Sequence, residues 1–219
     1  MVEIAKDTDA AVAGIADGST VLIGGFGPAG QPYALIDALR RGGAKDLTVV
    51  NNNAGNGSIG LAALLATGHV RRVVCSFPRQ ADSYVFEELY AAGRIELEVA
   101  PQGNLAERIR AAGAGIGAFY TPTGAGTMLA EGKEARVIDG REHVLEYPIH
   151  ADVALIRAHT ADEAGNLVYR KTGRNFGPIM ATAARLTVAE VTRIVPVGAL
   201  DPEAVVTPGI YVDRVVVTA

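Results

Sequence analysis

Tryptophan is missing from the 219 residues of this chain, and aromatic residues make up only 5% of it. Cys75 is the single cysteine, which excludes an intrachain disulfide and a cysteine-rich zinc site. Its position at the end of the apolar run Val73–Cys75 predicts a buried structural thiol rather than a nucleophile. We expect no metal site, because the four histidines lack the spacing of metal ligands: His69, His143, His150 and His159.

Long hydrophobic runs are also absent, since no stretch approaches the ~18 consecutive apolar residues of a membrane span. The N-terminal segment lacks the pattern of a secretory signal, so we expect a cytoplasmic protein. The formal charge is −4, and lysine and arginine are scattered along the chain without forming a basic stripe. This distribution disfavours a nucleic-acid or anionic-membrane partner and leaves small-molecule chemistry open.

What the sequence does contain is a regular alternation of short apolar runs, glycine-containing loops and amphipathic segments. The apolar runs predict strands at 20–23, 47–50, 70–74, 95–99, 153–158, 167–169 and 214–218. The segments before and between them predict helices at 9–16, 32–41, 59–66, 82–92, 105–112 and 176–184. Successive strand, loop and helix units predict the α/β class, an open and mostly parallel sheet with helices on both faces.

The length of 219 residues favours one domain spanning 1–219, because no linker or repeat interrupts the pattern. Asn104 and Glu107 have the spacing of a capping box, which places the start of the 105–112 helix at Asn104. The glycine-rich segment 113–132 is predicted to be a long ordered loop.

Three loops follow predicted strands and precede predicted helices, and ligands bind at that edge of an open parallel sheet. They are the loops 24–30, 51–57 and 101–104. Their polar groups are backbone amides and neutral carboxamides, which suit a carboxylate or a developing oxyanion and therefore acyl transfer. Asn and Gly are also common in turns, so any single asparagine has an ordinary structural alternative.

The glycines Gly25, Gly27 and Gly30 also match the dinucleotide-binding fingerprint, which makes a dinucleotide-dependent oxidoreductase an alternative. Two details oppose it. The ribose-binding acid expected about 20 residues on is absent, since Asn51 to Asn53 stand there, and Pro28 removes an amide donor from the loop. A binding module without catalytic activity is a further alternative.

The segment from Asp17 to Pro32, DGSTVLIGGFGPAGQP, resembles the signature of the A subunits of family I CoA transferases. The likeness continues through 52–55, 101–110, 119–124, 165–171 and 174–176, and so covers nearly the whole chain. Within the family, the segments 75–80, 82–86 and 175–180 are most similar to the 3-oxoadipate branch. An acetoacetate or acetate enzyme is the nearer alternative.

The resemblance implies a CoA-transferase-like fold with a Rossmann-like core, and a chain that is inactive alone. It implies a ping-pong transfer of CoA from succinyl-CoA to a 3-oxo acid, with a glutamate nucleophile on a separate B subunit in an A2B2 assembly. CoA thioesters would be substrates, and no cofactor would be bound. Glu163, before Ala164-Gly165, is the nearest imitation of the nucleophile motif and is interpreted as a solvated turn residue.

This chain would then contribute one wall of a shared active site. Gln102 is the first candidate for binding the acyl or carboxylate oxygens, with Asn52 and Asn53 second. The loop from Gly24 to Gly30 would bring backbone close to the reacting groups; its candidate residues are Gly24, Gly25, Phe26, Gly27 and Gly30. Arg79 is a candidate for reading the second carboxylate of 3-oxoadipate and succinate, with an ordinary surface arginine as the alternative.

Overall fold

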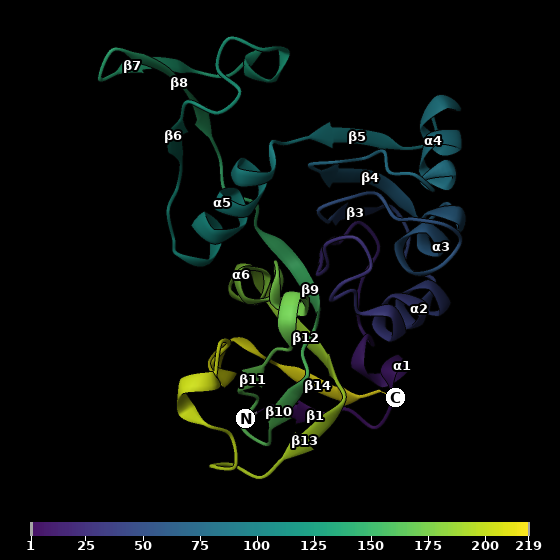
Figure 1. Ribbon diagram of the computed structural model, residues 1–219. Coiled ribbons are helices and arrows are strands. Elements are labelled where there is room, and N and C mark those ends of the chain that lie inside the picture. The colour runs from purple at the N-terminus through teal and green to yellow at the C-terminus, as the bar shows by residue number, and fades with distance from the viewer. Residues whose placement is uncertain (1, 219) are drawn as a thin grey trace.

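An eight-stranded sheet forms the centre of the computed structural model, which describes residues 2–218 (Figure 1). Its strand order is β1-β14-β12-β9-β2-β3-β4-β5, and every neighbouring pair runs parallel. The strands are β1 (Glu3–Ile4), β2 (Thr20–Ile23), β3 (Leu47–Val50), β4 (Val70–Cys75), β5 (Glu96–Val99), β9 (Ala151–Arg157), β12 (Ala184–Val191) and β14 (Arg214–Val217). The predicted α/β class with a parallel sheet is confirmed.

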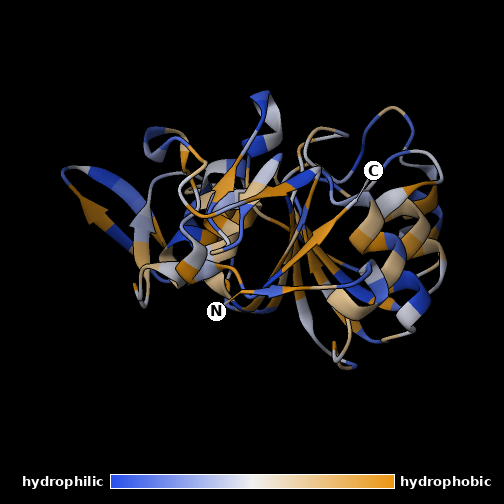
Figure 2. Cartoon of the chain, turned by 90° about the horizontal axis from the view of Figure 1, so that it is seen from below, coloured by the Kyte–Doolittle hydropathy of each residue, from blue (hydrophilic) through white to orange (hydrophobic). Residues whose placement is uncertain are grey.

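Helices cover both faces of this sheet (Figure 1). One face carries α1 (Thr8–Ala11), α2 (Tyr33–Gly42), α3 (Gly60–Ala66) and α4 (Tyr84–Ala91), and the other carries α5 (Gln102–Gly113) and α6 (Gly177–Ala183). Side chains alternate along each strand, so Val21 and Ile23 join the core under α1–α4 while Leu22 joins the core under α5 and α6. Figure 2 accordingly shows apolar strands between the helices. Burial on both faces explains why these strands are near-continuous apolar runs.

Two small sheets lie outside the central one. The first joins β11 (Leu167–Val168), β10 (Thr160–Asp162) and β13 (Arg193–Val195). The second is antiparallel and projects beyond α5 in Figure 1; we call it the arm, and it joins β6 (Phe119–Thr121), β8 (Arg141–Glu146) and β7 (Ala135–Ile138). Short 3-10 helices complete the fold: η1 (Met128–Ala130), η2 (Lys171–Arg174), η3 (Pro202–Ala204) and η4 (Gly209–Tyr211).

A buried carboxylate fastens the arm to α5. Glu146 is only 3% exposed, and it accepts hydrogen bonds from Lys133 Nζ at 2.6 Å and Asn104 Nδ2 at 3.2 Å. Asn104 Nδ2 also donates to the Thr123 carbonyl oxygen at 3.1 Å. The arm and the start of α5 therefore share one satisfied polar network, as a buried charge requires.

Three predictions about local structure were wrong. The capping box is absent: α5 begins at Gln102 with Pro101 as its N-cap, because Asn104 is drawn into the Glu146 network. The segment 113–132 is not a continuous loop, since it contains β6 and η1. The first helix ends at Ala11 rather than at residue 16, and Gly14 then adopts φ +87°.

Among residues 2–218, no helix combines the length and the apolar character that crossing a bilayer demands.

Candidate active site

The path of the chain through the sheet creates a switch point between β2 and β9. From β2 the chain proceeds outward to β5, and it then returns to β9 on the other side of β2. Ligand crevices of open α/β sheets lie at the carboxyl ends of the strands beside such a switch. The loop 24–30 leaves β2 at this point, and its first amide, Gly24 N, donates to the Leu155 carbonyl oxygen on β9 at 2.9 Å.

Left-handed glycines shape this loop, and a distant segment packs against it. Gly25, Gly27 and Gly30 have φ values of +129°, +56° and +73°. A Cβ on Gly30 would lie 2.4 Å from the Gly173 carbonyl oxygen and 2.7 Å from Asn175 Nδ2. Glycine at position 30 is therefore required both by its backbone conformation and by the close approach of residues 173–175.

Asn175 ties the two segments together. Its Oδ1 accepts a hydrogen bond from Gly25 N at 3.1 Å, and its Nδ2 donates to the Ala29 carbonyl oxygen at 2.9 Å. A second pair of bonds, from Phe176 N at 2.7 Å and to the Thr172 carbonyl oxygen at 2.8 Å, holds the side chain in its own loop. The glycine loop is consequently a fixed surface between two halves of the sheet.

The three asparagines after β3 have three different environments. Asn51 is fully buried and joins two strand ends, since its Nδ2 donates to the Ile23 carbonyl oxygen at 2.6 Å and its Oδ1 accepts from Asn53 N at 2.9 Å. Asn53 is also fully buried, and neither atom of its side-chain amide has a hydrogen-bond partner within residues 2–218. Only Asn52 lines the pocket described next.

That pocket has a volume of about 420 Å³ and gathers residues from the ends of β2, β3, β4 and β5; we call it the amide pocket, and its lining is Phe26, Asn52, Ser76, Phe77, Gln80 and Gln102. Asn52 Oδ1 accepts hydrogen bonds from Gln102 Nε2 at 2.8 Å and from Ser76 Oγ at 2.9 Å. These bonds fix which way the Asn52 amide points. Asn52 Nδ2 makes no hydrogen bond within the described residues, so it is free to donate to a ligand.

The amide pocket offers donors without charge. None of its six lining residues carries an ionisable acid or base, and the Ser76 hydroxyl donates to Asn52 rather than to a base. Gln102 and Asn52 can therefore stabilise negative charge that develops on a carbonyl oxygen. The pocket lacks an activated nucleophile, which needs an adjacent base or a lowered pKa. Across residues 2–218, no group of three or more acidic, histidine or cysteine side chains could hold a metal ion.

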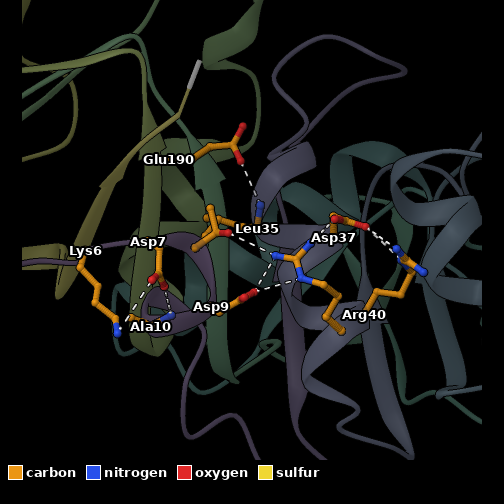
Figure 3. A network of polar contacts seen from close by, with 10 residues as sticks. Lys6, Asp7, Asp9, Ala10, Leu35, Asp37, Arg40 and Glu190 are labelled. Atoms are coloured by element: carbon orange, nitrogen blue, oxygen red, sulfur yellow. Dashed lines mark hydrogen bonds and ion pairs between the residues drawn. The ribbon is translucent and has the colours of Figure 1, made fainter.

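The Glu190 carboxylate occupies the N-terminus of α2, where a dinucleotide-binding protein would bind the pyrophosphate. Glu190 Oε2 accepts from Leu35 N at 3.1 Å (Figure 3) and also from Ala34 N at 3.0 Å, and both amides belong to the first turn of α2. Anions bind at helix N-termini through such amides. Because Glu190 already satisfies them, the glycine loop lacks the phosphate site that its spacing otherwise suggests.

The sequence-derived candidates thus divide by location. Gln102, Asn52 and Phe26 come together in the amide pocket, whereas Asn53 is fully buried and does not line it. Gly24, Gly25, Gly27 and Gly30 form the loop beside it. Arg79 is exposed and does not line this pocket, although its neighbour Gln80 does. The sequence analysis assigned no role to Ser76, Phe77 and Asn175. Ser76 directly follows β4, and this position after a strand could have placed it among the candidates.

Known proteins resemble this chain in sequence and in fold. The family model described as Coenzyme A transferase matches residues 5–218. The chain is 68% identical to the A subunit of the 3-oxoadipate CoA-transferase of Pseudomonas putida, over 94% of this chain and 89% of that protein. It is 55% identical to the A subunit of the succinyl-CoA:3-ketoacid coenzyme A transferase of Xanthomonas campestris pv. campestris (strain B100), over 97% of this chain and 88% of that protein.

A solved acyl-CoA transferase from E. coli O157:H7, in a thioester complex with CoA, superimposes with a TM-score of 0.87 at 23% identity. The match covers 99% of this chain but only 47% of that one, so this chain spans about half the length of that enzyme. This likeness concerns the fold. The family model spans almost all of the described residues, and the relatives match over nearly their full lengths, so the chain belongs to the coenzyme A transferase family.

Proposed function

We propose that this chain is the A subunit of a CoA transferase that moves CoA from succinyl-CoA to 3-oxoadipate. The observation that carries the proposal is the amide pocket, which has two oriented carboxamides and no nucleophile. An acyl-transfer site of this kind needs hydrogen-bond donors for the oxyanion and also a nucleophile. Because the pocket has only the donors, the nucleophilic carboxylate comes from a second chain. That chain is a B subunit with a glutamate nucleophile, in an assembly of two A and two B subunits.

Exposed apolar side chains beside the pocket support a partner at this edge. Phe26 and Phe77 line the pocket and are 50% and 58% exposed, and Ile59 at the start of α3 is 64% exposed. Ile59 lines an adjoining hollow that shares Gln80 with the amide pocket, and exposed apolar side chains grouped around a polar site are typical of an interface. A B subunit resting on this rim would exclude water from the pocket, which strengthens each hydrogen bond inside it.

The relatives support 3-oxoadipate as the acceptor. The 68% identity to a protein named for 3-oxoadipate exceeds the 55% identity to one named for 3-ketoacids in general. Acetoacetate is the second candidate acceptor, because that relative is matched over 97% of this chain.

Gln102 and Asn52 serve as donors to the thioester or anhydride oxygen as the glutamate attacks and charge develops. Gln102 Nε2 has a second proton beyond the one bonded to Asn52 Oδ1, and Asn52 Nδ2 has both of its protons available. CoA leaves as a thiolate and then attacks the glutamyl carbonyl of the anhydride, which releases succinate and gives a glutamyl-CoA thioester. The carboxylate of 3-oxoadipate attacks that thioester and CoA leaves again as a thiolate. Its attack on the 3-oxoadipyl carbonyl of the second anhydride forms 3-oxoadipyl-CoA and frees the glutamate.

The test is a transfer assay with three samples: this chain by itself, the B chain by itself, and the co-purified complex. We expect succinyl-CoA:3-oxoadipate transfer from the complex only. Gln102→Ala should lower kcat by about 10²–10³, the usual effect of losing one oxyanion donor. Gln80→Ala is the matched control, since Gln80 lines the same pocket without bonding Asn52, and it should cost less than about tenfold. Transfer by this chain without its partner, or equal effects of the two variants, would contradict the proposal.

A further inference from the structure

A second pocket lies across the glycine loop from the amide pocket, at the carboxyl ends of β9 and β12. Its volume is about 390 Å³; we call it the basic pocket, and its lining is Ala29, Gly30, Arg157, Ala158, His159, Arg170, Lys171, Thr172, Gly173 and Thr192. Three of these residues carry a permanent positive charge, and none is acidic. This concentration of charge stands out in a chain whose formal net charge is −4.

Two of the cations are free to bind a ligand. Arg170 and Lys171 are exposed, and neither side chain makes a hydrogen bond or an ion pair with any of residues 2–218. Lys171 also has a φ of +51°, in the left-handed region that residues other than glycine rarely adopt. Such backbone strain occurs preferentially at ligand-binding positions.

The third cation, Arg157, is held in place from behind. Its Nε lies 3.6 Å from Glu190 Oε1, and Glu190 is anchored by the α2 amides. The Arg157 side chain is 42% exposed whereas that of Glu190 is 2% exposed. Glu190 therefore positions Arg157 from the protein side, and the guanidinium keeps accessible donors toward the pocket.

The two pockets are connected over the glycine loop. A third hollow of about 410 Å³ lies between them and is lined by Phe26, Ala29, Thr172 and Asn175. It shares Phe26 with the amide pocket and shares Ala29 and Thr172 with the basic pocket. The hollow therefore adjoins both pockets along the glycine loop.

We infer that the basic pocket binds the distal carboxylate of dicarboxylic acyl groups, an assignment that rests on the proposed function. Succinyl and 3-oxoadipyl groups each carry a second carboxylate. In a ping-pong reaction they occupy the same acyl site in turn, so one cationic pocket serves donor and acceptor. The two groups differ in length, and the long, unpartnered side chains of Arg170 and Lys171 can reach either carboxylate.

The test uses 3-oxoadipate and succinate, which carry carboxylates, and free CoA, which carries phosphates, to distinguish the two kinds of anion that the basic pocket could bind. The co-purified complex carries Arg170→Met together with Lys171→Met, at exposed positions where no side-chain hydrogen bond or ion pair within the described residues is lost. We expect the KM for 3-oxoadipate and the inhibition constant of succinate to rise at least about tenfold, with kcat within threefold and the inhibition constant of free CoA within twofold. Such a change in KM alone is typical of lost uniform binding.

Two further variants make the experiment specific. Arg185→Met removes an arginine whose side chain is 88% exposed at the amino end of β12, the opposite edge of the sheet, and it should change none of these constants. Arg79→Met tests the rival position for the same carboxylate. A tenfold loss with Arg79→Met but not with the double variant would overturn the inference, as would unchanged constants in the double variant or a rise confined to free CoA.

Succinate binding to the complex, measured by titration calorimetry, needs no turnover. A complex that binds succinate through Arg170 and Lys171 but transfers no CoA to 3-oxoadipate would refute the proposed function and leave the pocket assignment standing. A complex that transfers CoA normally, with succinate affinity unaffected by the double variant, would refute the pocket assignment alone.

Discussion

Replacing Gly30 with alanine tests whether the segment 170–175 is seated on the glycine loop. Both pockets depend on that contact, because Gly30 lines the basic pocket and its loop lines the amide pocket. The added Cβ would lie 2.4 Å from the Gly173 carbonyl oxygen, a distance that real Cβ contacts do not reach. The obstacle is backbone, which cannot rotate away as a flexible side chain would.

Two costs combine in Gly30→Ala. An L-residue at φ +73° has a left-handed conformation that costs about 1–2 kcal/mol. Forcing an extra methyl group into packed surroundings costs about 1–3 kcal/mol more. The expected loss in the free energy of unfolding is therefore about 3–4 kcal/mol at the centre of these ranges.

Gly27→Ala is the matched control in the same loop. Gly27 has φ +56°, but a Cβ there would meet no atom within 4 Å. It therefore carries only the conformational cost of about 1–2 kcal/mol. The two variants should differ by about 2 kcal/mol, or about 4–8 °C in Tm for a chain of this length.

Urea titration and thermal unfolding followed by circular dichroism provide the assay. Gly30→Ala should unfold at the lower temperature, and its KM for 3-oxoadipate should rise as the segment carrying Arg170 and Lys171 is displaced. Equal Tm values for the two variants would mean that Gly173 does not contact the glycine loop. The continuous surface between the two pockets would then be refuted.

Burial raises the pKa of the Glu190 carboxyl, against the opposing effects of the α2 amides and Arg157. A raised folded-state pKa gives stability that is full below the unfolded-state pKa and is lost as pH rises through the folded value. Glu190→Gln removes this loss. As the pH rises from 4 to 7, the free energy of unfolding of the variant should therefore increase relative to that of the native chain. A relative decrease would show that the fold favours the ionised carboxylate. Burial also raises the pKa of the Cys75 thiol to about 12. Iodoacetamide at pH 8 should therefore leave Cys75 unmodified in the folded protein and alkylate it in urea. Rapid labelling without denaturant would contradict the burial of β4.

The central strands were predictable because their burial on both faces leaves a plain sequence signal. The predicted bounds of β2 and β3, 20–23 and 47–50, match the structure. By contrast, β12 escaped prediction, because Arg185, Thr187 and Glu190 interrupt its apolar pattern. Glu190 is tolerated inside the sheet because it caps α2, more than 150 residues away in the chain, and lies 3.6 Å from Arg157.

The sequence contains a local turn motif for the hairpin in the arm, but the charged residues around it obscured the strand pattern. Asp139 and Gly140 join β7 to β8 with φ values of +49° and +75°, which is the pattern of a type I′ turn. An Asp-Gly pair between two short strands is the strongest local indication of a hairpin. Exposed, charged strands on both sides of the turn weakened the alternation that would have completed the prediction.

Strand order explains how much of the site could be foreseen. Gln102 and Asn52 were expected at one sheet edge because both follow strands, and their side chains are joined by a hydrogen bond of 2.8 Å. The basic pocket was not foreseen. Arg157 and Lys171 reach the glycine loop only through the return of the chain to β9 and the contact of Gly173 with Gly30, and neither feature has a local sequence pattern.

The arm has a structural consequence for the amide pocket. Helix α5 begins with Gln102, and two residues later Asn104 is bonded to Glu146 at the base of the arm. One helical turn and the Asn104–Glu146 hydrogen bond therefore join the Gln102 backbone to the base of the arm. A molecule that binds the arm would therefore bind a part of the chain that is bonded to the helix carrying Gln102.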